Sequence, residues 1–258
     1  MDLHGKVALI TGACGAIGRE IAIAASSAGA RVILNDICPQ QDAAEFVQAV
    51  GGRSGNAAYF QADVANRECV ERMFDDAAEQ FGAPDICIGN AAIVAAGPFL
   101  DLSERSWHDH LETNLTGCFH VGQAAARRMV KAGKPGKIIY ISSWVQDVPS
   151  ENITAYCVAK SGLKMLAKCM ALELGRRGIT VNLVAPGFVD AGLSGRMFRE
   201  KPGLRQECEQ YVPLGGIMSA ADVASATMLL CSQGADYMTG STLLVDGGNS
   251  LFLRRGNA

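Results

Sequence analysis

The sequence lacks the features that would place the protein on nucleic acid or in a membrane. Its net charge is only −3, which gives no reason to expect nucleic acid or an acidic membrane surface as a partner. No apolar run reaches the length needed to span a bilayer. A predicted strand starting at Lys6 leaves no room for a signal peptide before it. We therefore expect a cytoplasmic protein.

Disulfides and metal sites are not indicated either. The nine cysteines are scattered and odd in number, without a C-x-x-C pair, which favours reduced thiols in a cytosolic protein. We interpret most of them as small core residues. Of the four histidines, His108 and His110 are two residues apart and would diverge on a helix. We expect no metal ion.

Short apolar segments alternate with longer amphipathic segments from one end of the chain to the other. Strands are expected at residues 6–10, 31–35, 57–61, 85–89, 137–141, 180–184 and 242–245. Helices are expected at residues 17–28, 40–50, 67–81, 104–131 with a break near Asn114, 154–176 and 220–231. This alternation predicts a parallel sheet covered on both faces by helices. Right-handed crossovers make it a doubly wound, seven-stranded Rossmann fold of the α/β class.

One domain is expected to span residues 1–258. Hydrophobic residues make up 49% of the chain and charged residues 19%, which is ample for a sizeable core. There is no linker, repeat or low-complexity tract. Only residues 188–216 depart from the alternation, because they hold several glycines, two prolines and a cluster of charges. We interpret this segment as a mobile lid over a substrate site.

A glycine-rich turn follows the first predicted strand. Residues 11–18 read T-G-A-C-G-A-I-G, and such a turn lets the backbone approach a pyrophosphate whose charge the following helix N-terminus stabilises. A tight turn without a ligand is the plainer alternative. The position on the first strand–helix unit favours nucleotide binding.

An acidic side chain ends the second predicted strand. Asp36 is placed to accept hydrogen bonds from adenine-ribose hydroxyls and to repel a 2′-phosphate. No Lys or Arg lies inside the glycine turn, so NAD fits better than NADP. Asp63, Val64 and residues 89–92 follow the third and fourth strands, at the carboxyl edge where ligands of such sheets bind.

Three side chains with acid–base or hydrogen-bonding chemistry are predicted to meet at the same edge. Tyr156 and Lys160 lie four residues apart on one face of a predicted helix, and Ser143 follows the end of the strand at 137–141. An ammonium group favours phenolate and so lowers a tyrosine pKa, which suits proton exchange with an alcohol or carbonyl. The Y-x-x-x-K spacing alone is weak evidence, because many helices carry it by chance.

Together these motifs resemble the short-chain dehydrogenase/reductase family over nearly the whole chain. The family's T-G-x-x-x-G-x-G motif is similar to residues 11–18, and its Asp-Val pair is similar to Asp63-Val64. Its P-G turn matches Pro186-Gly187, and its terminal D-G-G matches residues 246–248. Its active-site tetrad maps onto Asn114, Ser143, Tyr156 and Lys160.

Three positions depart from the family pattern. Ala16 replaces the middle glycine of the first motif, and its methyl group lies where the pyrophosphate is expected. The family's N-N-A-G is only partly kept at residues 89–92, which read G-N-A-A. Ala191 replaces a threonine that commonly bonds the nicotinamide amide, so that backbone groups near Val189 must do more of that work.

The resemblance implies an NAD-dependent oxidoreductase. Tyr156 would be the general base for alcohol oxidation and the general acid for carbonyl reduction, and Ser143 would hydrogen-bond the substrate oxygen. Lys160 would hold the nicotinamide ribose and lower the tyrosine pKa, and Asn114 would anchor a water that links Lys160 to solvent. Cofactor contacts are implied for Gly12, Cys14, Gly15, Ala16, Ile17, Gly18, Asp36, Asp63, Val64, Asn90, Ala91, Tyr156, Lys160, Pro186, Gly187 and Val189.

Plainer roles stay open for the tetrad. Ser143 could cap backbone at the strand end, Asn114 could bond its neighbours inside a helix, and Lys160 could be an exposed helix lysine. A non-catalytic NAD(H) sensor is the alternative from another class, although such a protein should have lost part of the tetrad. A methyltransferase would need neither Tyr156 nor Lys160.

The substrate site is expected after Ser143, in the loop after the fourth strand and in the lid. The residues that bind substrate are predicted to be Ser143, Trp144, Gln146, Tyr156 and Arg196, with Ile93, Val94, Asp147, Phe188 and Asp190 as further candidates. Polar side chains among them favour a sugar, polyol or hydroxy acid; a 3-oxoacyl thioester or a steroid-like alcohol is the alternative. Similar proteins usually form tetramers, and small residues along 154–171 suit close helix packing, so we expect a homotetramer.

Overall fold

Seven strands form one parallel sheet in the computed structural model, which describes residues 1–51 and 55–251. The strands are β1 (Val7–Thr11), β2 (Arg31–Asp36), β3 (Ala57–Gln61), β4 (Ile86–Gly89), β5 (Gly136–Ile141), β6 (Ile179–Pro186) and β7 (Thr242–Val245). Their order is β3-β2-β1-β4-β5-β6-β7, and each neighbouring pair is parallel. The order reverses between β1 and β4, which confirms the predicted doubly wound Rossmann fold.

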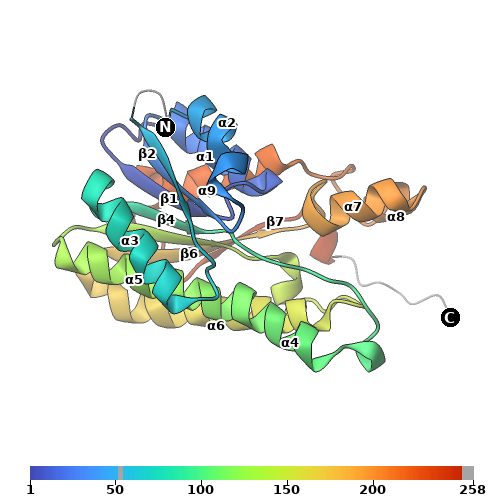
Figure 1. The fold of residues 1–258 in the computed structure, drawn as a ribbon. Coiled ribbons are helices and arrows are strands. Elements are labelled where there is room, and N and C mark those ends of the chain that lie inside the picture. Colours follow the sequence, from blue (N-terminus) through green and yellow to red (C-terminus); the bar gives the residue numbers. More distant parts are fainter. Residues whose placement is uncertain (52–54, 252–258) are drawn as a thin grey trace.

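Helices cover both faces of the sheet, as Figure 1 shows. One layer holds α1 (Ala16–Ser27), α2 (Gln40–Ala49) and α9 (Ala220–Cys231), and the other holds α3 (Arg67–Phe81), α5 (Gly117–Lys131) and α6 (Thr154–Leu174). A separate hydrophobic core lies between each layer and the sheet. All five residues of β1 are buried, because this central strand faces a core on both sides.

Local sequence signals fix several helix ends. Asn66 precedes α3 and its side chain accepts a hydrogen bond from the Cys69 backbone N–H, which satisfies one of the free donors of the first turn. Ser219 and Asp222 form a reciprocal capping box at the start of α9. These caps hold helices that flank the sheet, so that the strand ends keep fixed positions.

The break predicted near Asn114 is a π-helical turn. It covers Glu112–Thr116 and joins α4 (Glu104–Leu111) to α5. Such turns place one extra residue into a helix and often occur at functional sites.

Residues 188–216 contain two helices that the sequence did not predict. They are α7 (Gly192–Glu200) and α8 (Leu204–Glu209), which project from the end of the sheet in Figure 1. Both are short and lie among glycines and prolines, so a periodicity long enough to predict them is absent. The lid role of the segment stays a prediction. Across the described part of the chain, no helix is both long and apolar enough to cross a membrane.

Candidate active site

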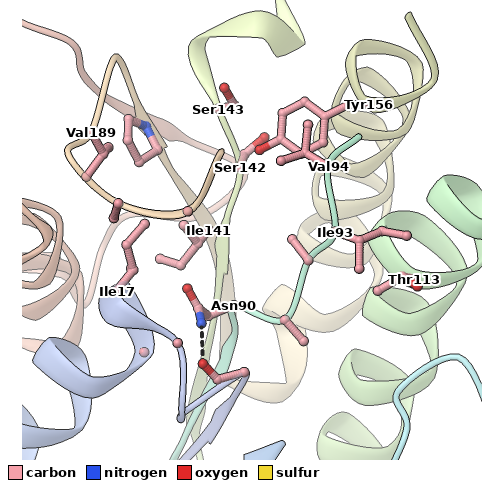
Figure 2. Close-up of a pocket in the computed structure, with 18 of the residues that line it drawn as sticks. Ile17, Asn90, Ile93, Val94, Thr113, Ile141, Ser142, Ser143, Tyr156 and Val189 are labelled. Atoms are coloured by element: carbon pink, nitrogen blue, oxygen red, sulfur yellow. Dashed lines mark hydrogen bonds between the residues drawn. The ribbon is translucent and has the colours of Figure 1, made fainter. Parts of the chain in front are cut away.

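A cavity of about 690 Å³ opens at the carboxyl edge of the sheet, where the strand order reverses. It is lined by the turns after β1, β2 and β4, by the ends of β5 and β6, and by the first turns of α6. Figure 2 shows Ile17 and Asn90 at one end of this pocket and Val94, Ser143 and Tyr156 at the other. Every cofactor contact predicted from the sequence, Gly12 to Val189, lines the cavity.

Backbone packing leaves no room for a side chain at two positions of the glycine turn, Gly12 and Gly18. Gly12 has φ +63°, and a Cβ there would lie 2.8 Å from the Ala91 Cα. A Cβ on Gly18 would lie 2.1 Å from the Gly12 carbonyl oxygen. The turn is also tied to the end of β4, because Asn90 Nδ2 donates to the carbonyls of Thr11 (3.0 Å) and Gly12 (3.1 Å). The result is a rigid floor made of backbone.

The N-terminus of α1 faces this floor. Its N-cap is Gly15, and no side chain accepts a hydrogen bond from the first helical turn. Free N–H groups and the positive end of the helix dipole suit a pyrophosphate. Ala16, the departure from the family's glycine, is exposed and lines the cavity.

Asp36 closes the far end of the cofactor region. Its Oδ2 accepts a hydrogen bond from the Cys14 N–H (2.9 Å), and its Oδ1 accepts one from the Ile37 N–H (2.8 Å). The carboxylate therefore has a fixed position and still lines the cavity. The nearby cation Arg19 does not line it, because Arg19 packs over Phe46 and donates to the Cys14 carbonyl.

The three predicted catalytic side chains converge at the other end of the cavity. Ser143 and Tyr156 both line it, and the Ser143 hydroxyl is close enough to Tyr156 to influence the pKa of its phenol. Lys160 is 1% exposed; its Nζ lies 5.5 Å from the centre of the Tyr156 ring and donates to the Ile141 carbonyl at 2.8 Å. The alternative of an exposed helix lysine is therefore wrong. Ser143 also caps backbone weakly, accepting from the Val145 N–H at 3.4 Å.

One predicted electrostatic effect is wrong in this structure. Burial raises the pKa of Tyr156 to about 12, and the nearby Ser143 hydroxyl opposes that rise. Burial lowers the pKa of Lys160. The ammonium group binds a carbonyl rather than the phenol, so it does not produce the predicted lowering of the tyrosine pKa.

Asn114 does not line the cavity but fixes the loop that does. Its side chain is fully buried; Oδ1 accepts from the Ile93 N–H (2.8 Å) and Nδ2 donates to the Ile93 carbonyl (2.9 Å). His110, one turn earlier, accepts from the Ala95 N–H at Nε2 (3.0 Å). Sequence analysis missed this second clamp, although the i, i+4 spacing of His110 and Asn114 was available as a signal.

The substrate end of the cavity is mainly apolar. Gln146 is buried away from it, accepting from Ser142 Oγ at 2.8 Å and donating to Asp147, and Arg196 lies outside the lining. Two predicted substrate-binding residues are therefore not in the site. Trp144 is in the lining and packs edge-on against Phe188, with ring centres 5.7 Å apart. Residues of this end are Ile93, Val94, Thr113, Ser143, Trp144, Val145, Ser150, Ile153, Tyr156, Phe188, Ala191 and Ser194.

The fold and the site define a dinucleotide-binding oxidoreductase, and comparisons with known proteins give its family. A family model described as enoyl-(acyl carrier protein) reductase matches residues 12–250. The 3β-hydroxysteroid dehydrogenase 1 of Eggerthella lenta is 37% identical over 251 residues, covering 97% of this chain and 96% of that protein. The 3-oxoacyl-(acyl-carrier-protein) reductase FabG of Haemophilus influenzae is 36% identical, covering 95% and 98%.

Solved structures agree with these relatives. One from Agrobacterium tumefaciens, described as a candidate gluconate dehydrogenase, superposes with a TM-score of 0.92 at 30% identity and covers 98% of both chains. The chain belongs to the short-chain dehydrogenase/reductase family. It is an oxidoreductase of a family that uses nicotinamide cofactors. The floor of backbone, the free helix N-terminus and the buried Lys160 fit such a dinucleotide.

Proposed function

We propose that the protein is an NAD-dependent oxidoreductase that interconverts an apolar secondary alcohol and its ketone. The observation that carries this proposal is the continuity of one cavity. It runs from the glycine turn and Asp36 to Ser143 and Tyr156, which both line it, and it ends among apolar side chains. A dinucleotide held in the first part would present its nicotinamide to an alcohol in the second.

The catalytic roles follow from the positions of the side chains. Bound nicotinamide supplies the acceptor or donor of the hydride. Tyr156 takes the hydroxyl proton of the alcohol during oxidation and returns it to the carbonyl oxygen during reduction. Ser143 donates a hydrogen bond to the same oxygen, whose negative charge is greatest in the transition state.

Lys160 and Asn114 position the other groups. The Lys160 ammonium has three N–H bonds, and the one to Ile141 fixes its direction while the others can hold ribose hydroxyls. Asn114 fixes Ile93 through both of its side-chain polar atoms, which keeps the loop after β4 in place. The predicted anchoring of a water by Asn114 stays a prediction.

Asp36 supports NAD as the cofactor. Its two oxygens accept backbone N–H bonds, which hold the carboxylate in one position at the cavity wall. A fixed negative charge accepts ribose hydroxyls and repels a 2′-phosphate. Replacing Asp36 with Ser should raise kcat/KM for NADP relative to NAD by roughly tenfold or more, because one repulsive charge is removed.

The lining supports an apolar substrate. The prediction of a sugar, polyol or hydroxy acid depended on polar candidates, but Gln146 and Arg196 are absent from the cavity wall. Asp190 binds Arg205 and Asp147 binds Lys164. The walls offer Ile93, Val94, Trp144, Ile153 and Phe188, which suit a hydrocarbon surface. The relative named as a hydroxysteroid dehydrogenase is in keeping with this chemistry.

A 3-oxoacyl thioester is the second candidate substrate, because the FabG relative is named as a reductase of such groups. Initial rates decide between the candidates. Each enzyme assay would contain NAD or NADP with a 3-hydroxysteroid, a 3-hydroxyacyl thioester, or a sugar, polyol or hydroxy acid, and Tyr156→Phe would serve as the blank. Activity confined to polar alcohols, or a clear preference for NADP, would contradict the proposal.

We also propose that the protein assembles as a cytoplasmic homotetramer through α6. Its outer face carries Val158, Met165 and Leu172 at intervals of seven residues, and they are 42%, 60% and 86% exposed. Apolar residues at this spacing suit contact with a second helix. Sedimentation of the wild type should give a tetramer, and Leu172→Glu should give smaller species with an unchanged circular dichroism spectrum.

A further inference from the structure

Two cysteines from separate loops meet beside the cofactor region of the cavity. Cys14 belongs to the glycine turn after β1, and Cys38 follows the end of β2. Their sulfur atoms lie 3.1 Å apart, with the Cys38 thiol donating to Cys14. Both residues are half-buried and neither is in a disulfide. This sulfur–sulfur distance is only about 1 Å longer than a disulfide bond.

The surroundings hold the pair in place. Tyr59 is buried; its hydroxyl donates to the carbonyls of Asp36 (3.0 Å) and Cys38 (2.5 Å) and lies 3.3 Å from the Cys38 sulfur. The Cys14 N–H binds the Asp36 carboxylate. These contacts fix the backbone at Cys14 and Cys38, so that the two side chains extend from fixed positions toward one another.

We propose that Cys14 and Cys38 form a reversible disulfide that controls dinucleotide binding, an inference that rests on the proposed NAD-dependent function. The oxidant is a small-molecule disulfide such as oxidised glutathione. The Cys38 thiolate attacks one of its sulfurs and expels the first small-molecule thiol. The Cys14 thiolate then attacks the Cys38 sulfur and expels the second. Overall, two cysteine thiols lose two electrons and two protons, and the small-molecule disulfide becomes two thiols.

The order of the two steps follows from the environment of Cys14. Burial, the thiol of Cys38 and the charge of Asp36 together raise the pKa of Cys14 to about 12. A thiol with a raised pKa supplies little thiolate, so attack on a dissolved oxidant begins at Cys38. The second attack is intramolecular, and the close approach of the sulfurs compensates for the scarcity of the Cys14 thiolate.

The bond would change the cofactor region directly. Closing the gap by about 1 Å pulls the glycine turn and the loop after β2 together, with Asp36 between them. Cys14 and Ile37 both line the cavity. If Cys14 and Ile37 are displaced, Asp36 moves with them and the dinucleotide loses at least one hydrogen bond to this charged side chain. We therefore expect the affinity for the dinucleotide to fall about tenfold.

The experiment compares reduced and oxidised full-length protein. After equilibration in glutathione buffers and blocking of free thiols, tryptic digestion separates residues 7–19 from residues 32–53, and each peptide holds a single cysteine. We expect one cross-linked species lighter than the two peptides by two hydrogens. NADH affinity, measured by fluorescence without any alcohol, should fall about tenfold in the oxidised sample and return with dithiothreitol.

Variants separate this disulfide from other oxidation. Cys38→Ser should bind NADH equally well in both buffers, and the control Cys69→Ser should still respond like the wild type. If Cys38→Ser is insoluble, Cys38→Ala and the wild-type peptide map give the same test. Absence of the cross-linked peptide, glutathione trapped on Cys38 alone, or a cross-link without loss of affinity would each overturn the proposal. If the reduced protein fails to bind NADH, this result would instead contradict the proposed function.

Discussion

The two ends of the cavity differ in what forms their walls, which is mainly backbone at one end and side chains at the other. The dinucleotide end has a floor of backbone, with glycines packed so closely that a single Cβ at Gly12 or Gly18 has no space. The substrate end is made of apolar side chains, and several of them come from loops and from the segment before α7. The backbone at the ends of buried strands is held in one conformation, whereas side chains on loops can adopt several rotamers. The comparison teaches that cofactor and substrate recognition are separable here.

The chemistry lies at the boundary between these ends, and its loss should give the largest effect. Tyr156→Phe removes the hydroxyl proposed to exchange a proton with the substrate, so kcat should fall by about 10²–10⁴-fold. NADH affinity and the melting temperature should stay near those of the wild type. Stopped-flow or steady-state rates together with NADH fluorescence measure both quantities. Retention of more than a tenth of the activity would remove Tyr156 from the mechanism.

A methyl group added at Gly18 in the glycine turn should weaken dinucleotide binding without changing the substrate end. Gly18→Ala puts a Cβ 2.1 Å from the Gly12 carbonyl, whereas Gly15→Ala meets that oxygen at 3.4 Å, an ordinary contact. We expect NADH affinity to fall roughly 100-fold or more in Gly18→Ala, because the floor must shift by about 1 Å. Gly15→Ala is the matched control and should lose much less. Equal losses in both variants would show that packing against Gly12 does not define this end.

The same contrast explains what the sequence could predict. Spacing from strand ends located the glycine turn, Asp36 and Asn90, because the carboxyl edge of a parallel sheet brings such positions together. Spacing could not give the direction of a side chain: Gln146 lies in a 3-10 turn and points to Ser142, away from the substrate. Nor could it show that Lys160 binds the Ile141 carbonyl, since that contact depends on how α6 packs on the sheet, where it lies against β6.

The pH dependence of the oxidation rate should test the raised pKa of Tyr156, which lies between the two ends of the cavity. Because burial raises the pKa of Tyr156 to about 12, the phenolate needed for oxidation is scarce at neutral pH. The value of kcat/KM for the alcohol should rise about tenfold per pH unit between pH 6 and 10, since this parameter reports the free enzyme. Reduction uses the protonated phenol, so its pH profile should contain no step from Tyr156 over this range.

Removing the hydroxyl of Ser143 tests the cause of this profile. The Ser143 hydroxyl lowers the pKa of Tyr156, so Ser143→Ala should raise that pKa further and slow oxidation at every pH while keeping the slope. A plateau of the wild type near pH 7 would contradict the raised pKa. It would instead support the predicted effect of Lys160, which is to lower the pKa of Tyr156.

The smallest effect is expected at the substrate end, where one apolar side chain is shortened. Val94 lines the cavity near Tyr156 (Figure 2), and Val94→Ala removes two methyl groups from a wall that contacts substrate. KM for an apolar alcohol should rise about tenfold or less, with KM for NAD and the Tyr156 pH profile unchanged. Gly97→Ala in the same loop, where an added Cβ meets nothing within 4 Å, is the control and should alter neither constant. A rise in KM for NAD in Val94→Ala would show that the two ends of the cavity are coupled, because the loop after β4 holds both Asn90 and Val94.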